Sequence, residues 1–301
     1  MKRAMVFLTA AVTLVGSAAM AAEVAVVSNK NLADCRAASA GAVRATGDVP
    51  GLPDTIPLIE LDGSAADDQA LEKLKGMRPK VVISLSSYAT HMVKHVLPET
   101  WVVYALVPFP EVEGFTRDPK MVGIAGLGSE AELYSLANGL GRAKRLAVLH
   151  SELISPSVEP MLRRLKEAGF SPTDFSLSQA PLMEEVMSKV VGNYDAVLLL
   201  PDPLTANPYR LRFIVTACLN KKVLTLTTDL GLIANGALCG TYVPPETAGS
   251  QAAIVAGEIL STGKPPMHPV VFWPGSKPSV SMAALRILDL PVPKVPGILI
   301  Q

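Results

Sequence analysis

Polar side chains cluster where one short apolar run ends. Residues 81–85 read Val-Val-Ile-Ser-Leu, a pattern typical of a buried strand. Ser86, Ser87 and Tyr88 follow at once. If a helix begins here, its first amide N–H groups lack acceptors and its dipole favours negative charge. The segment is therefore a candidate to hold a ligand carboxylate. The alternative is that Ser86 or Ser87 only caps its own helix.

A second polar cluster follows an apolar run at residues 223–226. Thr227, Thr228 and Asp229 occupy the equivalent place there. A carboxylate that faces a serine-lined helix end suits an amino-acid zwitterion, because charged groups bind most strongly to charged or well-aligned polar partners. Asp229 could instead cap the turn that follows it.

Three further side chains are candidates for ligand contact. Asp202 comes directly after an apolar run at 196–200, in a loop that could reach a ligand. Tyr88 and Phe109 could stack on a planar ligand, or they could simply pack within the face of a lobe.

Residues 195–242 predict a unit of one strand, one helix and a second strand. The run at 196–200 is stopped by Pro201, Asn207 suits a helix N-cap, and Pro208 suits the first helical position. An apolar stripe then follows at helical spacing: Leu211, Ile214, Val215, Cys218 and Leu219. Such a unit implies parallel strands, and ligands of open parallel sheets lie beyond the carboxyl ends of the strands. The loops that follow the two strands are therefore site candidates.

The same alternation runs along the whole chain and predicts an α/β protein with two doubly wound, Rossmann-like lobes. Two late elements, a helix ending at Gly263 and a strand near Val270, suggest that the chain recrosses between the lobes and forms a multi-stranded hinge. We expect one lobe from residues 23–124 with about 240–275, and the other from 125–239 with about 276–301.

A family resemblance appears in the same region. The run from Leu200 through Thr228-Asp229-Leu230-Gly231 to Gly236 resembles the periplasmic substrate-binding components of bacterial ABC uptake systems, in the family that includes tryptophan and tyrosine binders. The segment from Ser281 to Pro293 is similar to the closing helix and short tail of that family. Asp202 directly after Pro201, and Ser281 in place of an Asn, depart from the family pattern. The resemblance implies a type I periplasmic binding protein-like fold and an amino-acid-like ligand.

Residues 1–22 form a separate unit. Lys2 and Arg3 precede an apolar core, and Ala19-Met20-Ala21 places small residues where a signal peptidase cuts. We therefore predict a secretory signal peptide and a periplasmic location. Its removal takes away two of the 27 basic residues and none of the 27 acidic ones. The mature chain is therefore close to neutral, which favours neither nucleic acid nor an anionic membrane surface as a partner.

Other chemistry finds little support in the sequence. His91 and His95 have a spacing that can bind a metal, but a solvated helix face explains them without a third ligand. The three cysteines, Cys35, Cys218 and Cys239, leave at least one free thiol, and a disulfide between the last two stays open. We expect no enzyme activity, no cofactor and no metal.

Two functions fit these observations. The first is a monomeric periplasmic solute-binding protein that captures a small organic ligand between its lobes and delivers it to an ABC permease in the inner membrane. The second is a sensor or accessory protein that presents the same closed form to a membrane signalling or uptake partner.

Overall fold

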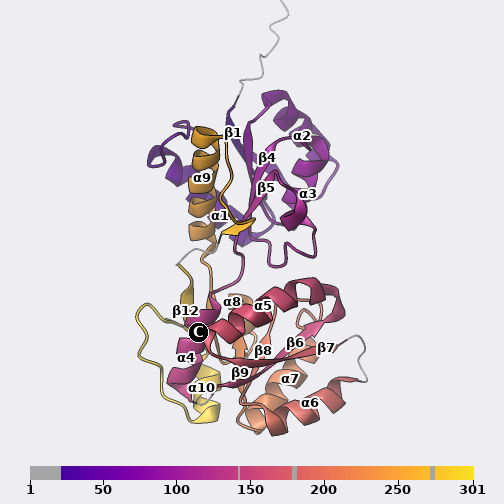
Figure 1. Cartoon of the computed structure of the whole chain (residues 1–301), viewed down its shortest axis with the longest axis vertical. Helices are drawn as coiled ribbons and strands as arrows, with labels where there is room; N and C mark the ends of the chain where they lie inside the picture. The colour runs from indigo at the N-terminus through magenta and orange to yellow at the C-terminus, as the bar shows by residue number, and fades with distance from the viewer. Residues whose placement is uncertain (1–21, 142, 178–181, 272–274) are drawn as a thin grey trace, which may run out of the picture.

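The computed structural model describes residues 22–141, 143–177, 182–271 and 275–301. Two lobes stack along the long axis of the molecule, and each has a mainly parallel sheet between layers of helices (Figure 1). This architecture confirms the predicted α/β fold of two doubly wound lobes. All but the last residue of the predicted signal peptide, residues 1–22, lie outside the described residues. Within the described ranges, no helix has the length and apolar character needed to cross a bilayer.

Lobe 1 contains a six-stranded parallel sheet in the order β11-β5-β4-β3-β1-β2. Its strands are β1 (Val24–Asn29), β2 (Leu58–Leu61), β3 (Val81–Leu85), β4 (Trp101–Ala105), β5 (Met121–Ile124) and β11 (Val270–Val271). Helices cover both faces, which explains why β1 and β3 are continuous apolar runs. One apolar core lies under α1 (Ala33–Arg44) and α9 (Pro245–Thr262). The other lies under α2 (Ala66–Met77) and α3 (Ser87–Val96).

Lobe 2 contains a seven-stranded sheet in the order β13-β12-β10-β9-β8-β6-β7, in which β12 is antiparallel to β10. Its strands are β6 (Arg145–Ser151), β7 (Ser171–Leu177), β8 (Ala196–Leu199), β9 (Leu224–Thr227), β10 (Cys239–Tyr242), β12 (Lys277–Val280) and β13 (Leu299–Ile300). The helices are α4 (Glu130–Leu140), α5 (Ser155–Ala168), α6 (Leu182–Asn193), α7 (Pro208–Asn220), α8 (Leu230–Ala234) and α10 (Met282–Leu288). One apolar core lies under α4, α5 and α10. A second core lies under α6 and α7, on the opposite face of the sheet.

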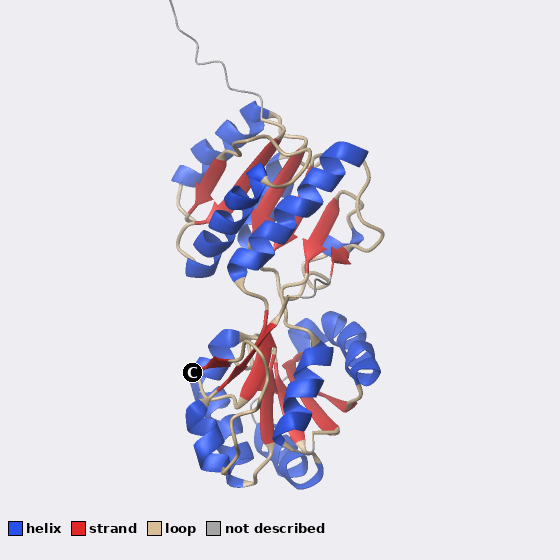
Figure 2. Cartoon of the chain, turned by 90° about the vertical axis from the view of Figure 1, so that its left-hand side faces the viewer, coloured by secondary structure: helices blue, strands red, loops and turns tan. Residues whose placement is uncertain are grey.

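The chain passes three times between the lobes (Figure 2). It crosses after β5, again between β10 and α9, and a third time between β11 and β12. The first crossing touches β10 at Gly128, where a Cβ atom would lie 2.3 Å from the carbonyl oxygen of Thr241. This contact gives Gly128 a packing role in the hinge. β10 pairs with β9 and β12, so lobe 2 extends to Tyr242.

Strand direction determines which edges of the two sheets face each other. β5 enters the hinge at its carboxyl end, and every other lobe 1 strand runs parallel to its neighbour in that sheet. β10 also enters the hinge at its carboxyl end, and β9, β8 and β6 run parallel to it. The carboxyl ends of both parallel sheets therefore face the opposite lobe.

The strand, helix and strand unit at residues 195–242 forms as predicted. The Asn207 side chain accepts hydrogen bonds from the amides of Tyr209 and Arg210, with Pro208 at the first position of α7. The predicted stripe is buried at Leu211, Ile214, Val215 and Cys218. β8 and β9, which this helix connects along the chain, pair directly and in parallel. Local cap and periodicity signals were sufficient here because each acts within one element.

Two further helix starts depend on contacts with distant residues. The N-cap of α1 is Leu32, and the side-chain amide of the preceding Asn31 donates to the carbonyl oxygen of Asp62. Ser129 caps α4 by accepting from the Glu132 amide, while the Glu132 carboxylate accepts from the Ser276 hydroxyl. The chain end also forms an extra strand, since β13 pairs with β12.

The cysteines pack as separate buried thiols, so the disulfide that the sequence left open does not form. Cys218 belongs to the core under α6 and α7, whereas Cys239 belongs to the core under α4, α5 and α10. These cores lie on opposite faces of the sheet, which prevents the two sulfur atoms from meeting. Burial raises the pKa of each of these two thiols to about 12.

Candidate functional site

The edge of lobe 1 has a strained backbone at the ends of two neighbouring strands. Ser86 follows β3 with φ 109° and ψ 158°, a region that only glycine adopts readily, and Leu106 follows β4 with φ 59°. The Ser86 amide donates to the Ala105 carbonyl oxygen at 3.1 Å, which ties the two strand ends together. Strain of this kind persists where the surroundings fix the backbone, and it often marks a binding site.

The same edge presents hydrogen-bond donors. The Ser86 hydroxyl caps α3 by accepting from the Ala89 amide at 3.3 Å, as its predicted capping role requires. Ser87 and Tyr88 occupy the first two helical positions, where amide N–H groups have no acceptor within the helix. The Ser87 side chain is half-buried. These amides and the Ser87 hydroxyl are arranged to donate to an anionic group.

Tyr88 contributes its ring to this edge but not a free hydroxyl. Its hydroxyl donates to Asp67 at 2.7 Å, and the buried Asp67 carboxylate also accepts from the amides of Asp62 and Gly63. The hydrogen bond to Asp67 is the main cause that raises the pKa of Tyr88 to about 12. A ligand can therefore contact the ring, while the phenol keeps its proton.

Phe109 lies in the loop between β4 and β5, which contacts lobe 2 before the chain returns to lobe 1. Its side chain is 9% exposed and belongs to the core that α4 and α5 cover. In the same loop, the Glu111 carboxylate accepts from the Ser157 hydroxyl of α5 at 2.6 Å. Phe109 thus joins the lobes by packing, the second of the two roles that its position allowed.

Asp202 is placed at the facing edge of lobe 2, with its carboxylate directed at backbone. Its oxygen atoms accept from the amides of Ser151 at 2.5 Å, Leu204 at 2.9 Å and Thr205 at 3.2 Å. The residue is only 4% exposed. Asp202 therefore holds the end of β6 against the loop that follows β8.

Asp229 and Thr228 remain more available. Asp229 caps α8 through one oxygen, Oδ1, which accepts from the Leu232 amide at 3.0 Å, and its side chain is half-buried. Within the described part of the chain, Oδ2 of Asp229 has no hydrogen bond, and the buried Thr228 hydroxyl has none either. Asp202 and Asp229 line one groove on lobe 2. This edge therefore offers one free carboxylate oxygen.

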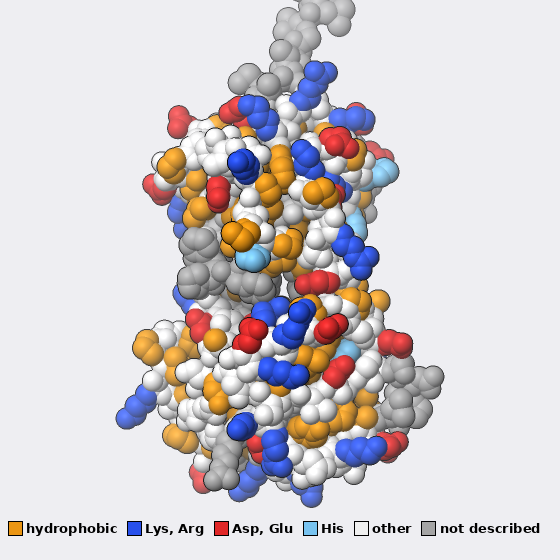
Figure 3. Space-filling model, viewed as in Figure 1, with side chains coloured by type: hydrophobic (Ala, Val, Ile, Leu, Met, Phe, Trp, Pro, Cys, Tyr) orange, Lys and Arg blue, Asp and Glu red, His pale blue; other side chains and the backbone are white. Residues whose placement is uncertain are grey.

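A cavity of about 590 Å³ lies beside the hinge, and no sequence motif pointed to it. Figure 3 shows acidic and basic side chains next to one another over α5, just below the waist of the molecule. The lining comes from both lobes and all three crossings: Ile124, Ala125, Leu127, Ser129, Glu130, Ala131, Glu132, Arg164, Glu167, Ala168, Val243, Thr247, Gln251, Gly275 and Ser276. The cavity lies next to the start of α4, where Ser129 is the N-cap. None of the predicted site residues lines this cavity.

Comparisons with known proteins bear on the fold. No protein-family model and no curated protein matches the chain. Among solved structures, a ligand-free, open substrate-binding protein with adhesive properties from Clostridium difficile is similar at 15% identity and a TM-score of 0.72, over 92% of this chain and 98% of that one.

Two further structures have the same arrangement. An ABC domain from Streptococcus pneumonia in complex with L-Trp is 15% identical, with a TM-score of 0.58, over 91% and 96% of the two chains. A periplasmic ribose ABC transporter protein from Conexibacter woesei is also 15% identical, with a TM-score of 0.53, over 91% and 97%. The chain therefore has the type I periplasmic binding protein fold that the sequence resemblance implied.

Proposed function

We propose that this protein is a periplasmic solute-binding protein of an ABC uptake system. In this proposal the mature chain works as a monomer, binds an amino-acid-like ligand between its lobes and delivers it unchanged to a permease in the inner membrane. The observation that carries the proposal is that the carboxyl ends of two parallel sheets face each other across a three-segment hinge. That edge is where ligands of open parallel sheets bind.

The two edges have complementary chemistry for a zwitterion. On lobe 1, the amides that begin α3 and the Ser87 hydroxyl would donate to the ligand carboxylate. On lobe 2, the free oxygen of Asp229 would accept from the ligand ammonium group. A ligand held by both edges binds the closed arrangement more tightly than the open one, and it therefore shifts the population toward closure.

The similar structures support this role at the level of the fold. One is a complex with L-Trp and another is described as a ribose transporter, so the fold accommodates amino acids and sugars in those proteins. For this chain, the donor-rich lobe 1 edge and the acidic lobe 2 edge favour the amino acid. The near-neutral charge of the mature chain accords with a small ligand rather than with nucleic acid.

A thermal-shift screen of the mature protein against amino acids, small carboxylates and sugars tests the proposal. A ligand at about one hundred times its dissociation constant should stabilise the protein by about 2.7 kcal/mol. We expect stabilisation by at least one amino acid and recovery of that amino acid chemically unchanged. Stabilisation by sugars alone would refute the ligand class, and conversion of the bound compound would refute a purely binding role.

A further inference from the structure

We propose that the hinge cavity is a second binding site, selective for a small organic ammonium ion. The cavity volume of about 590 Å³ lies within the range of small-molecule sites. It is separate from the proposed amino-acid site, because Ser87 and Asp229 do not line it. Its walls combine an apolar strip at the hinge, formed by Ile124, Leu127 and Val243, with polar side chains on both sides.

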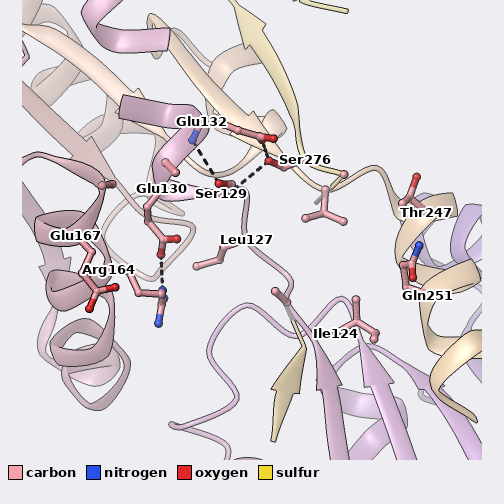
Figure 4. Close-up of a pocket in the computed structure, with 15 residues that line it drawn as sticks. Ile124, Leu127, Ser129, Glu130, Glu132, Arg164, Glu167, Thr247, Gln251 and Ser276 are labelled. Atoms are coloured by element: carbon pink, nitrogen blue, oxygen red, sulfur yellow. Dashed lines mark hydrogen bonds and ion pairs between the residues drawn. The ribbon is translucent and has the colours of Figure 1, made fainter. Parts of the chain in front are cut away.

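The buried side-chain oxygen of Gln251, unpartnered within the described ranges, points to a ligand in this cavity. Its side chain projects from α9 next to Thr247, on the side of the cavity opposite Glu130 and Arg164 (Figure 4). The residue is only 8% exposed, and its Oε1 atom has no hydrogen-bond partner among the described residues. A buried amide oxygen without a partner is costly, and a ligand that donates to it removes that cost.

The charges around the cavity determine which kind of ligand fits. Of the described residues that line it, Glu130, Glu132 and Glu167 are acidic and Arg164 is basic. Arg164 donates to Glu130 at 2.8 Å, so the guanidinium already neutralises the most buried of these carboxylates. The carboxylates in excess favour a cation. An anion would face them without compensation.

The contacts of Glu132 and Ser276 hold this part of the wall in place. The Ser276 hydroxyl donates to Glu132 and also accepts from the Ser129 amide, at 3.1 Å, at the start of α4. Glu132 itself is exposed, so its carboxylate keeps a face toward solvent at the cavity. An ammonium group between Glu132 and Gln251 would find a charged acceptor and a neutral one, while the apolar strip would cover the body of the ligand.

Calorimetric titration of the mature chain with tyramine tests this site, with 4-hydroxyphenylacetate as the probe in which a carboxylate replaces the amine. We expect tyramine to bind, with an affinity about tenfold lower in Glu132→Gln and in Gln251→Leu. The matched control is Glu258→Gln, which removes an exposed carboxylate from α9, the helix that carries Gln251. This variant should bind tyramine like the wild type.

Asp229→Ala separates this site from the proposed amino-acid site. Tyramine affinity should be unchanged in this variant, even if the amino-acid proposal fails. The inference is overturned if the wild type does not bind tyramine at millimolar concentration, if both cavity variants bind it like the wild type, or if Asp229→Ala alone loses binding. Equal affinity for 4-hydroxyphenylacetate would also overturn it, because the site would then not select a cation.

Discussion

At the lobe 1 edge the backbone presents amide donors next to Ser86 and Ser87, whereas at the lobe 2 edge the side chain of Asp229 presents an acceptor oxygen. The two edges occupy equivalent places in similar sheets, yet lobe 1 relies on a strained backbone and lobe 2 on a carboxylate. Two half-sites of opposite polarity suit a ligand that carries both charges.

Within the lobe 2 edge, some polar residues support the fold and others are left free for a ligand. Asp202 and Asp229 have the same side chain and line the same groove. Asp202 satisfies three backbone amides, while Asp229 satisfies one and leaves an oxygen free. Residue type and strand-end position alone therefore do not identify a ligand contact. The hydrogen bonds already made by each side chain decide it.

The largest expected effect is on stability, at Asp202. Replacing Asp202 with Ala leaves the buried amides of the β6 end and the following loop without an acceptor, and should lower the free energy of unfolding by about 3 kcal/mol. Urea denaturation measures this change. A loss below about 1 kcal/mol would contradict the structural role assigned to Asp202.

Asp229 should affect binding more than stability. Asp229→Asn keeps an oxygen that can cap α8 but removes the charge, so the free energy of unfolding should stay within about 0.5 kcal/mol of the wild type. Affinity for the amino acid found in the screen should fall about thirtyfold, equivalent to about 2 kcal/mol. Calorimetry on the two proteins gives the ratio, and equal affinities would remove Asp229 from the site.

The strain at Ser86 predicts that two substitutions change the stability in opposite directions. Ser86→Gly relieves a backbone conformation that suits glycine and loses only part of the cap, so the protein should gain about 1 kcal/mol. Ser86→Ala keeps the strain and loses the cap, and should cost about 1 kcal/mol. Denaturation curves of both variants provide the check. If glycine destabilises the protein as much as alanine does, the strain is not there.

The smallest expected effect concerns Tyr88. Its hydroxyl already donates to Asp67, so Tyr88→Phe should change ligand affinity by no more than about twofold. The raised pKa, about 12, means that the neutral phenol is favoured in the folded protein. This contribution to stability is present below the ordinary phenol pKa and is lost as the pH rises through about 12.

An alkaline absorbance titration tests the same group. Burial also raises the pKa of Tyr104, so the wild type should contain two late-ionising phenols, and the Tyr88→Phe variant should lose the one near pH 12 and keep the other. If the late component has the same amplitude in the variant as in the wild type, the hydrogen bond to Asp67 does not hold the Tyr88 proton.

Much of the fold was predictable because its signals are local. Asn207 and Pro208 predicted the start of α7, and the apolar run at Val81–Leu85 predicted β3. β13 was missed because it is two residues long and exists only by pairing with β12. Phe109 was ambiguous because its partners belong to the other lobe, beyond the reach of any local pattern.

The site was less predictable for the same reason. Asp202 binds the amide of Ser151, which is 51 residues earlier in the chain, so the sequence could not show that its carboxylate is occupied. The hinge cavity collects side chains from α4, α5 and α9, which come together only when both lobes are folded. The placement of Ser86 and Asp229 at the sheet edges was predictable because each directly follows a strand end or its first turn.

If a ligand closes the two edges onto each other, the molecule becomes more compact, and small-angle X-ray scattering measures that change. With the amino acid identified in the screen at about three times the wild-type dissociation constant, the radius of gyration of the wild type should fall. In Asp229→Asn, which should bind about thirtyfold more weakly, the radius at the same ligand concentration should stay close to the ligand-free value. A wild-type protein that binds the ligand tightly without any decrease in this radius would contradict capture between the lobes.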